Sequence, residues 1–154
     1  MADKPLMSFD ELSSAAAALN KASNELTTTI STLDQALYGL NIGLAVWVQV
    51  VLWSDPEGSG RYEREEVGYA KIGGMWGLAI RRLAGDEQSP EPDEVRDVWT
   101  FNDAPRELRL RAVEKLPDVL DELGKAAIKT AQTVNKKLVE ARAFTAALGL
   151  KVSK

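Results

Sequence analysis

Apolar residues recur every seven positions in the first quarter of the chain. The heptad leucines are Leu12, Leu19, Leu26, Leu33 and Leu40, and Ala16, Ser23, Ile30 and Leu37 each follow one of them by four positions. This period of 3.5 residues predicts an apolar seam along one side of a helix. Ser8 and Glu11 form a capping box in front of the seam. We therefore expect a helix over residues 9–38, about 45 Å long at 1.5 Å per residue.

The residues that flank this seam are small and mostly uncharged. Ser13, Asn20, Thr27 and Asp34 lie on one side, and Ala15, Ala22, Thr29 and Ala36 on the other. Such flanks allow another helix to approach closely but carry no charge code for choosing it. Two interpretations stay open at this point. The helix packs on its own domain, or it forms an interface with another chain.

Residues 42–101 show the pattern of an antiparallel meander of about four strands. The first strand, 42–53, is apolar on both faces, with the residues Ile42, Leu44, Val46, Val48, Val50 and Leu52 expected on one face and Trp47, Val51 and Trp53 on the other. A strand of this kind is covered on both sides, either by its own chain or by a partner. Gly73 and Gly74 predict a two-residue hairpin turn. The further strands are expected at 61–72, 75–83 and 95–101, with an acidic, mobile loop at 85–94.

The C-terminal third is again helical in pattern. Asn102 and Asp103 precede Pro105, as at many helix starts, and Pro117 kinks the helix or begins another one. An apolar stripe then continues to Leu148. The predicted fold class is α+β: a long N-terminal helix, the meander, and one or two C-terminal helices that pack with the first. We expect one domain over residues 1–154, built from the segments 9–38, 42–101 and 104–148.

Composition excludes several classes of function. The 154 residues include no Cys and no His. Disulfide scaffolds, zinc fingers, Cys- or His-ligated haem or iron–sulfur clusters, Cys nucleophiles and His-dependent triads are therefore excluded. We expect no cofactor, no metal site and no enzymatic activity.

Charge is distributed unevenly around a formal net charge of −4. Residues 41–104 hold six basic and twelve acidic residues, whereas residues 105–154 hold eleven basic and six acidic residues. The acidic middle and the basic end can attract each other within one chain or between chains. The start of the chain lacks a signal-peptide pattern, and the longest apolar run is too short to span a membrane. We therefore predict no membrane span and a cytoplasmic location.

Charged clusters offer only weak candidate sites. Glu63, Glu65 and Glu66 stand close to Arg61 and Arg64, and we expect them to form a solvated strand edge that discourages aggregation. Weak anion-binding candidates are the basic residues Arg81, Arg106, Arg109, Lys125, Lys129 and Lys136. Arg106 and Arg109 could instead pair with neighbouring acids. The basic C-terminal helix lacks interleaved aromatic residues, so nucleic acid is not the expected partner.

The four tryptophans, Trp47, Trp53, Trp76 and Trp99, are predicted to form one cluster. Such a cluster serves as core, as a binding face or as the wall of an apolar ligand cavity. The leading hypothesis is a non-enzymatic protein-interaction module that associates with itself as a homodimer or larger assembly. Its expected partner-binding residues are Leu12, Leu19, Leu26, Ile30, Leu33, Trp47, Trp53 and Trp99. The alternatives are a carrier of an apolar ligand or lipid, and an anion or nucleic-acid binder that uses the basic C-terminal helix.

Overall fold

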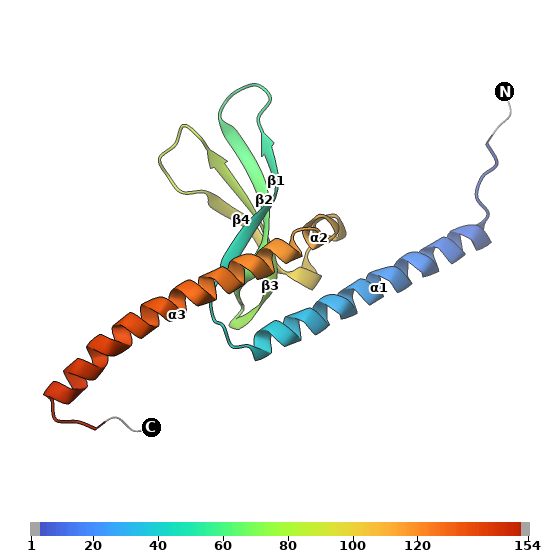
Figure 1. Ribbon diagram of the computed structural model, residues 1–154. Helices are drawn as coiled ribbons and strands as arrows, with labels where there is room; N and C mark the ends of the chain where they lie inside the picture. Colours follow the sequence, from blue (N-terminus) through green and yellow to red (C-terminus); the bar gives the residue numbers. More distant parts are fainter. Residues whose placement is uncertain (1–3, 152–154) are drawn as a thin grey trace.

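The computed structural model of the protein describes residues 4–151 and has the predicted α+β arrangement (Figure 1). The elements in chain order are α1 (Phe9–Gly39), β1 (Val46–Ser54), β2 (Arg61–Ile72), β3 (Met75–Asp86), β4 (Glu94–Thr100), the short helix η1 (Phe101–Asp103), α2 (Arg106–Val113) and α3 (Leu116–Ala147). Pro117 thus lies in the first turn of α3, where its missing N–H is no loss.

Helix α1 begins and ends where its sequence predicts. The Ser8 hydroxyl accepts a hydrogen bond from the Glu11 backbone N–H at 3.1 Å, which satisfies one of the free donors of the first turn. At the other end, Asn41 and Gly43 have positive φ angles of 51° and 64°. These left-handed residues stop the helix and redirect the chain toward the sheet.

The four strands form one antiparallel sheet in the order β1-β2-β3-β4. Gly73 and Gly74 make the predicted two-residue turn, with positive φ angles of 57° and 85° that suit glycine. Several predicted strand boundaries were wrong, and Phe101, expected in the last strand, belongs to η1. Residues 42–45 do not belong to β1, and β3 extends to Asp86, so the connection to β4 is shorter than the predicted loop at 85–94.

A bulge in β1 changes which side chains share a face. The register to β2 shifts between Gln49 and Val51, which inserts one extra residue into β1. As a result Trp47 pairs with Gly68, whereas Trp53 pairs with Glu63, and the two tryptophans lie on opposite faces of the sheet. The predicted placement of Val51, Leu52 and Trp53 was wrong for this reason.

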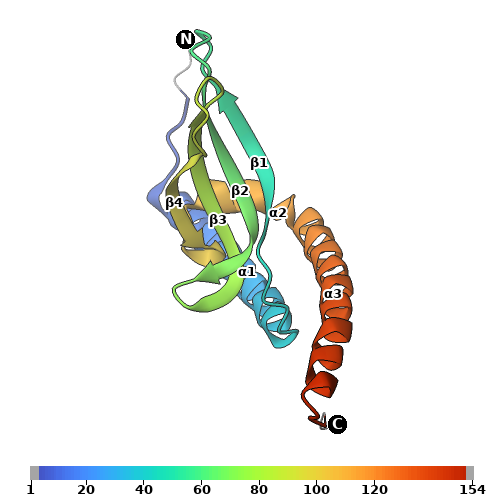
Figure 2. The ribbon, with the colours of Figure 1, turned by 90° about the vertical axis from the view of Figure 1, so that its left-hand side faces the viewer.

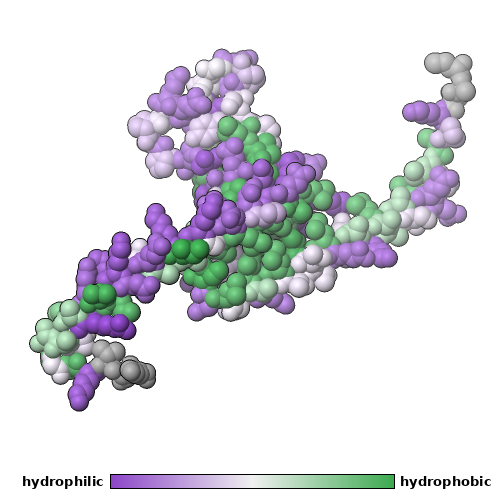
Figure 3. Space-filling view, viewed as in Figure 1, coloured by the Kyte–Doolittle hydropathy of each residue, from purple (hydrophilic) through white to green (hydrophobic). Residues whose placement is uncertain are grey.

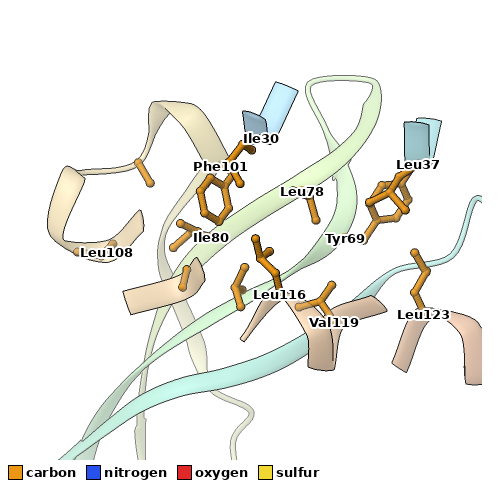
Figure 4. Packing of buried hydrophobic residues seen from close by; sticks show 13 residues of the cluster. Ile30, Leu37, Tyr69, Leu78, Ile80, Phe101, Leu108, Leu116, Val119 and Leu123 are labelled. Carbon is orange, nitrogen blue, oxygen red and sulfur yellow. The ribbon is translucent and has the colours of Figure 1, made fainter. Parts of the chain in front are cut away.

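The three α-helices all contribute to the buried cluster on one face of the sheet, which we call the covered face. The second half of α1 packs on β3 and η1, the first half of α3 packs on β1 and β2, and α2 packs on β2 and β3. Figure 4 shows their apolar side chains pointing toward one another. The buried cluster consists of Ile30, Leu37, Val67, Tyr69, Leu78, Ile80, Phe101, Ala104, Leu108, Ala112, Leu116, Val119 and Leu123.

Polar side chains hold α1 in place on the sheet. β4 pairs with β3 only as far as Ala79, and the Asp34 carboxylate accepts a hydrogen bond from the next β3 donor, the Leu78 N–H, at 2.7 Å. The Asn102 side-chain amide donates to the Thr27 carbonyl at 3.2 Å and to the Ser31 hydroxyl at 3.1 Å. Burial raises the pKa of Asp34, and the bond from Leu78 partly offsets this increase.

Candidate interaction surface

The first half of α1 projects beyond the sheet (Figures 1 and 2). We call residues 9–25 the α1 arm; within it, Phe9, Leu12 and Leu19 are 80%, 55% and 49% exposed. In the second half of the same helix, Ile30 and Leu37 are 3% and 7% exposed. The seam therefore lies against the chain's own core in one half of the helix and is bare in the other.

The predicted partner-binding residues on α1 divide accordingly. Leu12 and Leu19 lie on the arm and are available to a partner. Leu26 and Leu33 are partly buried against the core, and Ile30 lies inside it. Intrachain packing thus uses the last two heptads and leaves the first two uncovered.

Helix α3 is also half packed and half bare, but here the first half is packed and the second half is bare. Its first half supplies Leu116, Val119 and Leu123 to the core, whereas residues 128–147, the α3 arm, extend away from the sheet (Figure 1). Every residue of this arm except the half-buried Thr145 is exposed. Its large apolar side chains include Ile128, Val134, Leu138, Val139 and Phe144.

Apolar side chains also gather between the two helices. Figure 3 shows this strip at the centre of the molecule, continuous with the α1 arm and reaching the base of α3. Partly buried Leu33, Ile42 and Leu44 pack against the buried cluster, and Leu40 and Leu120 are 64% and 38% exposed. A contiguous exposed apolar surface of this kind marks an interaction site more often than scattered single residues do.

The tryptophans do not form the predicted single cluster. Trp47 lies on the outer face of the sheet under the Arg81 guanidinium, 4.1 Å from its ring centroid. On the covered face, Trp76 stacks on Tyr69 with ring centroids 5.9 Å apart, while Trp99 packs against the core. Trp53 is 43% exposed near the far end of the sheet. The bulge and the strand registers, which sequence reasoning missed, separate these four residues.

Two adjacent glutamates of β2 are buried, contrary to the predicted solvated edge. On the covered face, Glu65 is 1% exposed and accepts two hydrogen bonds from Arg111 of α2, at 2.6 and 3.2 Å. On the outer face, Glu66 is 7% exposed and accepts from Arg81 at 2.7 Å. Glu63 of the same strand is exposed, so the burial of Glu65 and Glu66 comes from the arginine side chains that lie against them, Arg111 and Arg81. The bonds to Glu65 also raise the pKa of Arg111.

The acidic connection between β3 and β4 is tied to the outer face. Asp93 accepts a hydrogen bond from the Tyr62 hydroxyl and forms an ion pair with Arg64 at 2.8 Å. Donation to Asp93 raises the pKa of Tyr62. A Cβ at Gly85 would collide with the side chains of both Asp93 and Tyr62, so a larger residue there would displace this hydrogen bond. The network stabilises the tip of the sheet and leaves Asp93 fully engaged.

The predicted anion-binding residues do not converge on one site. Arg81 is held by Glu66 and Trp47 on the outer face, whereas Arg106 and Arg109 belong to α2 on the covered face. Lys125 pairs with Asp121 at 2.9 Å, which raises the pKa of Lys125. Within residues 4–151, no ion pair is formed by Arg106, Arg109, Lys129 or Lys136.

Polar residues line a hollow of about 600 Å³ at the tip of the sheet, among them Arg61, Glu63, Asp86 and Arg96. Over the part of the chain that the structure describes, no group of three or more acidic side chains is placed to hold a metal ion. None of the described helices combines the length and apolar character needed to cross a membrane.

Comparisons with protein-family models, with curated proteins and with solved structures found no match.

Proposed function

We propose that this chain is a non-enzymatic protein-interaction module that associates with itself through the bare apolar faces of its two helical arms. The observation that carries the proposal is the unbroken seam of α1. The same side of the helix that buries Ile30 and Leu37 presents Phe9, Leu12 and Leu19 to water. Complete burial of an exposed leucine is worth about 1.5–3 kcal/mol, and covering the half-exposed Leu12 or Leu19 supplies about half of that, which favours association of two arms.

The absence of enzymatic activity remains part of the proposal. The chain has no Cys and no His, and its two buried carboxylates, Glu65 and Glu66, are held by arginines rather than directed into a cleft. Trp53 is exposed but lies near the far end of the sheet, away from the two arms, so it is not part of the proposed interface.

Light scattering coupled to size exclusion tests the proposal directly. We expect a species heavier than one chain at high protein concentration, and we expect it to persist at high salt because apolar contacts are not screened. Leu19→Asp or Val134→Asp should shift the protein to the monomer.

Matched controls place the same charge on the other side of each arm. Ala17 and Gln132 lie about 160° round the helix from Leu19 and Val134, at 100° per residue. Ala17→Asp and Gln132→Asp should leave the mass unchanged. A wild-type protein that is monomeric at every concentration and salt level would contradict self-association.

A further inference from the structure

The two arms extend toward opposite ends of the molecule. In Figures 1 and 2, α1 and α3 run in the same overall sense, and the α1 arm precedes the sheet while the α3 arm follows it. At 1.5 Å per residue, the 17 positions of the α1 arm and the 20 positions of the α3 arm span about 25 and 30 Å. Arms of similar length at opposite ends can be exchanged by a two-fold rotation.

The two arms carry opposite net charge. The α1 arm has the acidic residues Asp10, Glu11 and Glu25 and one basic residue, Lys21. The α3 arm has one acidic residue, Glu140, and the basic residues Lys129, Lys136, Lys137 and Arg142. Most of these charges lie away from the seams, at about one helix diameter from a paired helix. This distance is close to the screening length of about 8–10 Å, so the charges act weakly across the pair. Their effect is to disfavour pairing of two α1 arms or two α3 arms.

Large and small side chains alternate along the seams of both arms. On the α1 arm, Ala16 lies between Leu12 and Leu19, and Ser23 lies between Leu19 and the packed half of the helix. On the α3 arm, Ala141 lies on the same side as Val134 and Leu138, which are 57% and 40% exposed. Large residues pack well when they face small ones, so two antiparallel arms can interdigitate.

We infer that the partner is a second copy of this chain, turned by a two-fold axis so that each α1 arm lies antiparallel along the α3 arm of the other copy. This inference rests on the proposed self-association and adds its geometry. The apolar strip between α1 and α3 then lies near the axis and faces itself (Figure 3). The contact is isologous and closes at two chains, so it does not propagate into a filament. A stable interface buries about 1,600 Å² of surface, and the two helix pairs together with the strip can supply that area.

Cross-linking tests this arrangement cleanly because the chain has no cysteine. We choose Ala16→Cys, near the middle of the α1 arm, and Ala141→Cys, in the outer half of the α3 arm. Both positions lie on the seams, and the two cysteines are placed in separate chains. A short bismaleimide should join the two variants when they are mixed, and should give little product with either variant alone. Ser14→Cys lies on the outward side of the α1 arm and should cross-link poorly to Ala141→Cys.

The outcomes distinguish the pairing from self-association itself. Efficient cross-linking of Ala16→Cys to itself would overturn the crossed pairing, because it would join two α1 arms. A dimeric mass without any cross-link between the arms would also overturn it, while the proposed self-association would survive. A mass that grows without limit as concentration rises would overturn the closed two-fold arrangement. Monomers under all conditions would end both proposals.

Discussion

The two halves of α1 have the same heptad pattern and opposite surroundings. In the half that lies on the sheet, apolar positions are covered, Asp34 receives a backbone hydrogen bond, and Asn102 fastens the helix to η1. In the α1 arm, the apolar positions have no cover from the described chain. The comparison shows that a heptad pattern specifies an apolar face but does not specify whether the chain's own core covers that face.

The largest expected effect comes from the packed half of a long helix. Leu123 is 2% exposed, and Leu123→Ala should lower the free energy of unfolding by about 3 kcal/mol, through lost burial and the cavity it leaves. Leu138→Ala, on the α3 arm, should change monomer stability by less than about 0.5 kcal/mol. Urea unfolding at low protein concentration measures both. Equal losses would mean that the α3 arm packs on its own chain.

A buried and an exposed ion pair allow the same contrast between packed and bare parts of the molecule. Arg111→Met leaves the buried Glu65 carboxylate without its partner and should destabilise the fold by about 3 kcal/mol, the lower end for a broken buried pair, because the Arg111 side chain is itself 38% exposed. Lys125→Met removes an exposed pair with Asp121 and should leave the stability almost unchanged, because water screens the pair. Chemical denaturation again provides the measurement. An Arg111→Met protein as stable as the wild type would show that Glu65 finds another donor.

Asp34 has the smallest expected effect. Since folding raises its pKa, its contribution to stability is present below the unfolded pKa, near 3.8, and is lost as pH rises through the folded pKa. Asp34→Asn keeps an acceptor for the Leu78 N–H without the buried charge. We expect a gain of up to about 1 kcal/mol at neutral pH and little change in acid. Unfolding curves at both pH values check this, and a loss at neutral pH would contradict it.

Local signals in the sequence were enough to predict the element order. Ser8 and Glu11 mark the start of α1, and Gly73 and Gly74 mark the β2–β3 turn, because each acts through neighbouring backbone groups. The bulge at Gln49 to Val51 has no comparable local signal, so the face of Trp53 was predicted wrongly. The burial of Glu65 depends on Arg111, 46 positions away, which no short-range pattern could show.

The candidate interface was predictable in part. The heptads predicted Leu12 and Leu19 as partner-binding residues. The heptad spacing is the same in both halves of α1, so it could not show where α1 leaves the sheet. That point is set by the position of β3 and η1, which are distant in sequence. The contribution of α3 to the exposed surface was likewise hidden, since its apolar stripe runs evenly from the packed half into the arm.

Backbone hydrogen bonds in the two arms are protected only by the helices themselves. Packing rather than propensity supplies most helical stability, and the arms do not pack on the sheet. Thr29 and Thr32 also donate to the Glu25 and Thr28 carbonyls where the α1 arm meets the packed half, a bond that weakens and bends helices. In a single chain, amide protons of the α1 arm should therefore exchange with solvent much faster than those around Ile30. Pairing with a second chain would slow that exchange, so the ordering of the arms and the affinity between chains become one coupled quantity.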